Sequence, residues 1–162
     1  MEPFFITGLP RSRTAWMAAF LTGDGVLCHH ELMKFCKTKA EFYRSFDHPS
    51  LRIGNSDSGL MMTDFQNVFP DSPTVIIERP LDDVLQSLHD IEILVPREYL
   101  EDMQSKLSSL KAMRVEFENL DRQLPDVCDY IGVPYNREKH DIFRSLVVVT
   151  VDFTPDNYLI WR

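Results

Sequence analysis

The chain has 162 residues, 44% of them apolar, and this size and composition predict one soluble globular domain over residues 1–162. Lys and Arg number 17 against 25 Asp and Glu, and the net charge of −8 argues against a general nucleic-acid or anionic-membrane binder. No window approaches the roughly 20 apolar residues of a membrane span. Three cysteines without paired spacing argue against a disulfide framework and favour a reducing, cytoplasmic setting.

Apolar runs alternate with helix-like segments along the chain. We expect strands where β-branched or aromatic residues gather, at residues 4–8, 25–30, 51–54, 74–79 and 145–153. We expect helices at residues 13–21, 37–46, 60–69, 80–91 and about 96–114, then a strand end near 115–120 and a short helix that Gly132 and Pro134 close. This alternation predicts the α/β class with a largely parallel sheet.

The segment "ITGLPRSRTAW", residues 6–16, leaves the first expected strand through a glycine and a proline. Two arginines and two hydroxyl residues follow at once, in positions 11–14. Because a helix N-terminus presents unpaired N–H groups and a partial positive charge, such a turn is typical of a phosphate or sulfate site. The usual nucleotide loop, G-x-x-x-x-G-K-[ST], is not matched, since Arg13, Thr14 and Ala15 stand at its Gly, Lys and hydroxyl positions.

Three segments carry a family resemblance: "GLPRSRTAW" (8–16), "VIIERPLDDVLQSL" (75–88) and "VEFENLDRQLPDVCDYIGVP" (115–134). The first is similar to the phosphosulfate-binding loop of sulfotransferases that use 3′-phosphoadenosine 5′-phosphosulfate (PAPS). The second resembles that family's 3′-phosphate segment, in which a strand ends in Arg and a Ser follows eight residues later, as Arg79 and Ser87 do. The third is similar to the family's E-[DN]-L stretch and the helix after it.

The resemblance implies a three-layer, P-loop-like parallel sheet flanked by helices. It implies transfer of a sulfuryl group from PAPS to a small-molecule hydroxyl or amine, without a metal ion. It also implies that PAPS contacts the matching positions, which are Arg11, Ser12, Arg13, Thr14, Ala15, Trp16, Arg79 and Ser87. Arg11 stands at the loop's basic position, where we expect it to contact the bridging oxygen and the transferring sulfuryl group. Trp16 lies either against the adenine or in the core.

The chain departs from the family pattern at three points. Arg13 replaces the loop glycine, and it either points outward or binds a second anionic group. Ala15 removes one of two paired hydroxyls and leaves Thr14 alone. The final residues, "NYLIWR", do not match the family's basic, glycine-containing segment. We therefore expect either weak cofactor binding or another element in that role.

Candidate catalytic bases follow the second and third expected strands, near the edge of the sheet where ligands collect. Glu31 in "VLCHHELM" resembles a glutamate that some bacterial members use. His29 and His30 compete with Glu31, because imidazole titrates near neutral pH. In "RIGNSDSGL" the groups that could act as the catalytic base are Asp57 and Ser56. The sequence there is typical of a turn, and Asp57 either only forms this turn or also acts in catalysis.

Three other interpretations remain open. A non-catalytic module would keep a site for adenosine 3′,5′-bisphosphate or another nucleotide and lack transfer. A small P-loop phosphotransferase (kinase) would use Mg²⁺ and would place Glu78 at the acidic end of its strand. A zinc site from Cys28, His30 and Cys36 has no second ligand pair to support it.

Two further expectations concern the acceptor pocket and the assembly state. Residues 91–100 are a candidate loop over the pocket, where Arg97 would attract an anionic acceptor. The apolar run 146–153 is either an inner strand or an exposed edge that would pair in a homo-oligomer.

Overall fold

The computed structural model describes residues 1–148, and a five-stranded sheet in the order β2-β3-β1-β4-β5 forms its centre. All neighbouring strands pair in parallel, which confirms the predicted α/β class. The strands are β1 (Phe4–Gly8), β2 (Val26–His30), β3 (Arg52–Ser56), β4 (Thr74–Glu78) and β5 (Met113–Glu116). The chain leaves β1 toward β2 and later returns to β4 on its other side, so the strand order switches at β1, where α/β sheets collect ligands.

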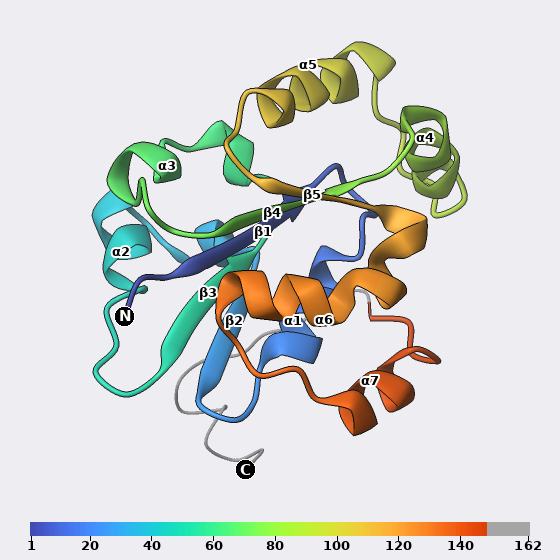
Figure 1. Cartoon of the computed structure of the whole chain (residues 1–162). Helices are drawn as coiled ribbons and strands as arrows, with labels where there is room; N and C mark the ends of the chain where they lie inside the picture. The colour runs from blue at the N-terminus through green and yellow to red at the C-terminus, as the bar shows by residue number, and fades with distance from the viewer. Residues whose placement is uncertain (149–162) are drawn as a thin grey trace.

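Helices cover both faces of the sheet and complete three layers (Figure 1). Helices α1, α6 and α7 lie on one face, and α2 to α5 lie on the other. Their bounds are α1 (Thr14–Leu21), α2 (Lys39–Arg44), α3 (Phe65–Val68), α4 (Leu81–His89), α5 (Arg97–Ser108), α6 (Leu120–Ile131) and α7 (Arg137–Phe143). Short 3-10 turns are η1 (Leu32–Phe35), η2 (Leu60–Met62) and η3 (Phe117–Asn119).

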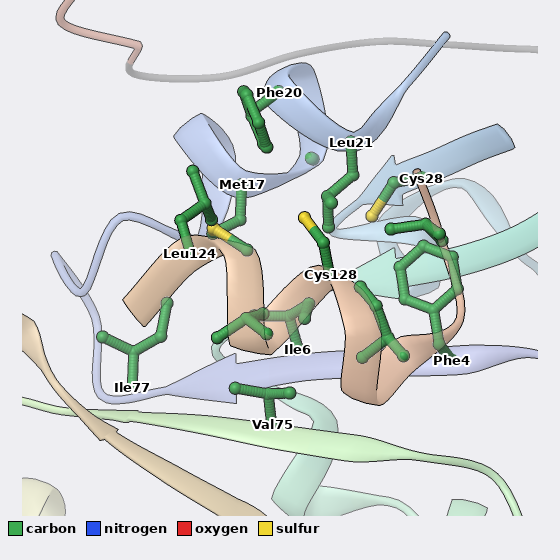
Figure 2. Close-up of a cluster of buried hydrophobic side chains, with 14 of the residues drawn as sticks. Phe4, Ile6, Met17, Phe20, Leu21, Cys28, Val75, Ile77, Leu124 and Cys128 are labelled. Atoms are coloured by element: carbon green, nitrogen blue, oxygen red, sulfur yellow. The ribbon is translucent and has the colours of Figure 1, made fainter. Parts of the chain in front are cut away.

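The core beneath α1 and α6 anchors the loop that leaves β1. Figure 2 shows Met17 of α1 beside Leu124 and Cys128 of α6, above Ile6 and Ile77 of the sheet, and all five side chains are buried. Every residue of β1 and every residue of α1 is buried. A parallel strand covered on both faces needs such a continuous apolar run. The loop is therefore held at both of its ends by the core.

Two expected helices have other bounds in the structure. The helix expected at 60–69 is divided into η2 and α3. Thr63 causes the break, because its extended backbone ends η2 and its hydroxyl bonds to the Leu60 carbonyl and the Phe65 amide. The helix expected at about 96–114 ends at Ser108, where Arg114 of the following strand donates to the carbonyl of that residue.

The predicted end of the helix at Gly132 is confirmed, because Gly132 has a φ of 68° and closes α6 in the left-handed conformation. The strand expected at 145–153 is absent from its described part, because residues 145–148 form a turn and coil after α7. Residues 149–153 lie outside the described part of the chain, and so does the homo-oligomer edge predicted there.

Candidate functional site

The loop between β1 and α1 turns tightly because Gly8 has no side chain. A Cβ at Gly8 would lie 2.6 Å from the Ile77 carbonyl oxygen and 3.1 Å from the Ser12 Cβ, so a larger residue would not fit. Arg11 and Arg13 both adopt the left-handed backbone conformation, with φ values of 66° and 61°. That conformation costs roughly 1–2 kcal/mol for a residue with a Cβ. Strain of this kind is typical of ligand-binding loops.

Arg11, Arg79 and Ser87 meet at this loop, although the first is 68 and 76 residues away from the other two. The Arg11 Nε donates to the Ser87 Oγ at 3.1 Å, and the Arg79 Nη1 donates to the Arg11 carbonyl at 2.5 Å. β4 ends at Glu78, Arg79 follows it directly, and Pro80 stands directly before α4, so the chain turns between Arg79 and the helical Ser87. The structure thus brings both predicted phosphate-binding segments into one cluster.

The Arg79 guanidinium also lies over the ring of Phe117, 4.4 Å from its centroid. Burial lowers the pKa of Arg79, Asp83 opposes this shift, and the nearby Arg11 adds to it. An arginine keeps its charge through such a shift. Two guanidinium groups therefore lie close together at the carboxyl edge of the sheet, which favours binding of an anion between them.

Ser12 has a buried hydroxyl that makes no hydrogen bond in the described part of the chain. A buried polar group without a hydrogen bond lowers the stability of the fold by roughly 1–3 kcal/mol, and most buried polar atoms have a partner. Thr14 is also buried, and its carbonyl accepts a 2.7 Å hydrogen bond from the Ser56 hydroxyl. Ala15 lies in the first turn of α1 and is buried. The unpaired donor of Ser12 therefore fits a loop that hydrogen-bonds an oxyanion.

Arg13 is directed away from this cluster. Both of its terminal nitrogens donate to the Asp121 carboxylate at 3.2 Å, and its guanidinium lies 4.1 Å from the Trp16 ring centroid. Burial raises the pKa of Asp121, but hydrogen bonds from Arg13 and His140 outweigh burial, and the net pKa is below its ordinary value. The anionic group that Arg13 binds is thus a side chain of α6. Sequence reasoning missed Asp121, because no local pattern links it to the loop.

Trp16 lies in the core beneath α7, the second of its two expected places. Only 2% of its surface is exposed, and its indole N–H donates to the Phe143 carbonyl at 2.9 Å. Phe20 stacks on the indole with centroids 5.3 Å apart and planes 12° apart. The residue at the family's adenine position is therefore enclosed in this structure.

Asp57 follows β3, the strand next to β1, and its backbone is fixed against β1. Its amide donates to the Ile6 carbonyl at 3.0 Å, and its carbonyl accepts from the Thr7 hydroxyl at 2.8 Å. The Asp57 carboxylate accepts from the Gly59 amide at 2.7 Å. Burial is the main cause that raises the pKa of Asp57, with the Gly59 hydrogen bond opposing it and Glu31 adding to it. Asp57 thus sits beside the loop with its carboxyl group partly desolvated.

Glu31 and His30 lie one strand farther from the loop, at the end of β2. Glu31 has a left-handed backbone with a φ of 51°, and its carboxylate forms an ion pair with Lys34. His30 is buried, its Nδ1 has no hydrogen-bond partner among the described residues, and burial lowers its pKa against the attraction of Glu31. His29 is also buried. Since neighbouring strands lie about 4.8 Å apart, the loop is nearer to Asp57 than to Glu31.

A cavity of about 730 Å³ opens between α5 and the carboxyl ends of β4 and β5. It shares Arg79 with the arginine cluster and Leu9 with the loop. Glu78, the acidic strand-end residue of the phosphotransferase hypothesis, also lines it and bonds to Arg114 at 2.8 Å. The segment 91–100, the candidate loop over the acceptor pocket, does not line this cavity: residues 91–96 connect α4 to α5, and residues 97–100 form the first turn of α5, where Arg97 pairs with Asp82.

Residues 1–148 contain no group of three or more His, Cys, Asp and Glu side chains that would hold a metal ion. Cys28, Cys36 and Cys128 are free thiols in the structure. Among the described helices, none has the length and apolar character needed to span a membrane.

The sequence matches no protein-family model and no curated protein. Among solved structures, the fold is similar to the crystal structure of mouse sulfotransferase SULT7A1 complexed with PAP. The TM-score is 0.58, and the sequences are 11% identical. The match covers 88% of this chain and 62% of that chain, so this chain spans less than two-thirds of its neighbour. At this level of identity, the likeness shows a sulfotransferase-like fold.

Proposed function

We propose that this protein is a sulfotransferase that moves a sulfuryl group from PAPS to a small-molecule hydroxyl or amine. One observation carries the proposal: the β1–α1 loop and the β4–α4 segment converge through Arg11, Arg79 and Ser87. Each segment alone is a common strand–turn–helix element. Together they place two arginines and a serine in one cluster at the edge of the sheet, which supports binding of an anionic nucleotide there. The fold shared with a sulfotransferase complexed with PAP supports this proposal.

The residues present fit the proposed nucleotide. The backbone N–H groups at the start of α1, with Arg11 and the unpaired Ser12 hydroxyl, would hold the 5′-phosphosulfate end. Arg79 and Ser87 would hold the 3′-phosphate. PAPS, when bound, supplies the activated sulfuryl group. The Arg11 guanidinium would stabilise negative charge that develops on the leaving phosphate oxygen.

Asp57 is the proposed base. The acceptor oxygen or nitrogen would form a bond to sulfur, the bond between sulfur and the 5′-phosphate oxygen would break, and the Asp57 carboxylate would take the acceptor's proton. Its position next to β1 and its raised pKa favour it over Glu31, whose carboxylate is paired with Lys34. A partly desolvated carboxylate binds a proton more strongly than an exposed one.

Calorimetric titration with adenosine 3′,5′-bisphosphate (PAP), AMP and ATP–Mg²⁺ tests the cofactor. We expect PAP to bind most tightly, and we expect Arg79→Ala to weaken PAP binding by at least about tenfold, since a charge-assisted hydrogen bond contributes roughly 1.5–3 kcal/mol. Arg44→Ala is the matched control, because Arg44 is exposed on α2 and its side chain bonds only to the Ala40 carbonyl among the described groups. Stronger binding of ATP–Mg²⁺, or no binding of any ligand, would refute the proposal.

Transfer itself needs a second assay. PAPS labelled with sulfur-35 is incubated with a panel of alcohols, phenols, amines and sugars, and labelled product is counted. Labelled product that forms with the wild type and is lost in Arg11→Ala would support the proposed transfer activity. Tight PAP binding without any product would support the non-catalytic module instead.

A further inference from the structure

Trp16 offers no surface to a purine base. Phe20, four residues later in α1, stacks on the indole, and Arg13, three residues earlier, lies over it. The indole N–H is already bonded to the Phe143 carbonyl, and 2% of the residue is exposed. Arg13 is in turn fixed by Asp121. A base that stacked on Trp16 would have to displace both an ion pair and α7.

The cavity beside β4 and β5 offers an apolar site next to the same phosphate-binding cluster. Its volume of about 730 Å³ lies within the range of roughly 300–1,000 Å³ that is typical of small-molecule sites. Leu9, Ile76, Leu107 and Phe117 give it apolar walls. Arg79 lines the cavity and also bonds to the Arg11 carbonyl, so one residue joins the cavity to the loop.

The charges of the cavity favour a base over another phosphate. Arg114, its second arginine, is already bonded to Glu78 and to carbonyls at the end of α5. Glu116 and Glu118 line the cavity and are exposed. Two carboxylates repel a phosphate, whereas they accept hydrogen bonds from an exocyclic amino group. The cavity therefore suits an aromatic ring that carries an amine.

We propose that the cavity between α5 and the ends of β4 and β5 binds the adenine of the nucleotide, in place of Trp16. This inference rests on the proposed function. The phosphates bind at Arg11, Arg79 and Ser87, and the ribose lies beside Arg79. The base enters the cavity toward Phe117, with its amino group facing the carboxylates. Trp16 keeps a structural role under α7.

A cavity-filling substitution tests the proposal without disturbing the core. Gln104 lines the cavity from α5 and is exposed, so Gln104→Trp fills the space that the base would take. Ser105→Trp is the matched control, because Ser105 is the next residue of α5, is exposed and does not line the cavity. Calorimetry measures binding of PAP and of ribose 3,5-bisphosphate, which lacks the base.

We expect Gln104→Trp to weaken PAP binding by at least about tenfold, a loss of the size that stacking of one base contributes. It should leave binding of ribose 3,5-bisphosphate unchanged, and Ser105→Trp should leave both ligands unchanged. If Gln104→Trp binds PAP within twofold of wild type while Arg79→Ala still loses it, the base lies elsewhere and the proposed function stands. If wild type does not bind PAP, the proposed function and this inference both fail.

Fluorescence gives an independent readout. Trp16 and Trp161 are the two tryptophans of the chain, so Trp161→Phe leaves Trp16 as the single indole reporter. PAP should leave the emission of Trp16 unchanged, because the base is remote from it. Strong quenching on titration with PAP, as stacking of adenine on the indole would cause, would overturn the inference.

Discussion

Replacing Ser12 by Ala should stabilise the free protein while weakening its binding of PAP. The Ser12 hydroxyl is fully buried and makes no hydrogen bond in the described part of the chain. Its desolvation costs about 1–3 kcal/mol, and removing one oxygen adds a cavity cost of about 0.3 kcal/mol. We therefore expect Ser12→Ala to raise the free energy of unfolding by about 1 kcal/mol. For a chain of this length, the melting temperature Tm should rise by roughly 2–4 °C.

Ser56→Ala is the matched control for the stability measurement. Ser56 is equally buried, but its hydroxyl donates to the Thr14 carbonyl at 2.7 Å. Its removal should lower the free energy of unfolding by about 1 kcal/mol, the net contribution of one hydrogen bond. Urea denaturation followed by circular dichroism measures both variants. Opposite signs for two buried Ser→Ala changes would show that Ser12, unlike Ser56, has an unpaired hydroxyl.

The second part of the measurement is binding. The Ser12 hydroxyl would donate to a charged phosphosulfate oxygen, so its loss should weaken PAP binding by about tenfold or more. A less stable Ser12→Ala would refute the reasoning about its unpaired hydroxyl. A more stable variant with unchanged affinity for PAP would show that this hydroxyl takes no part in anion binding.

The remaining predictions concern the other charged residues of the site. Arg11→Ala should lower single-turnover transfer by about 10²–10³, and transfer within a few-fold of wild type would contradict its assigned role. Asp57→Asn should lower the rate of transfer by a factor of about 10² or more. The activity of the wild type should rise with pH through a pKa above the ordinary Asp value near 3.9, because burial raises the pKa of Asp57. Asp121→Asn should lower the free energy of unfolding by about 1 kcal/mol at neutral pH, since the Arg13–Asp121 pair is partly exposed. The folded-state pKa of Asp121 is lowered, so its stabilisation is present above pH ~4 and lost as the pH falls through the lower folded pKa. Acid titration of unfolding should therefore show less acid sensitivity in Asp121→Asn than in wild type, and equal sensitivity would contradict the assignment.

The elements around the site could be predicted from sequence because their signals are local. The first strand is a continuous apolar run, and the glycine, proline and arginines after it mark a turn before a helix. Arg79, Pro80 and the helix that carries Ser87 likewise lie within one short segment. Gly132 ends α6 because the left-handed conformation there favours glycine. Backbone propensity and hydrophobic periodicity depend on residues a few positions apart, so a single sequence is enough to recognise these elements.

The partners of these residues were decided by tertiary structure. Arg11 and Arg13 are two positions apart in one loop, yet the first contacts Ser87 and the second binds Asp121, 108 residues away. The sequence pattern left two directions open for Arg13, because side-chain direction follows from the strained backbone and from the placement of α6. For the same reason, the sequence left two places for Trp16, in the core or against the adenine, and in the structure α7 covers it. By itself the sequence determined a parallel α/β sheet with an arginine-rich turn after its first strand. Which arginine faces an anion, and where a cavity opens beside it, depend on contacts between segments that only packing brings together.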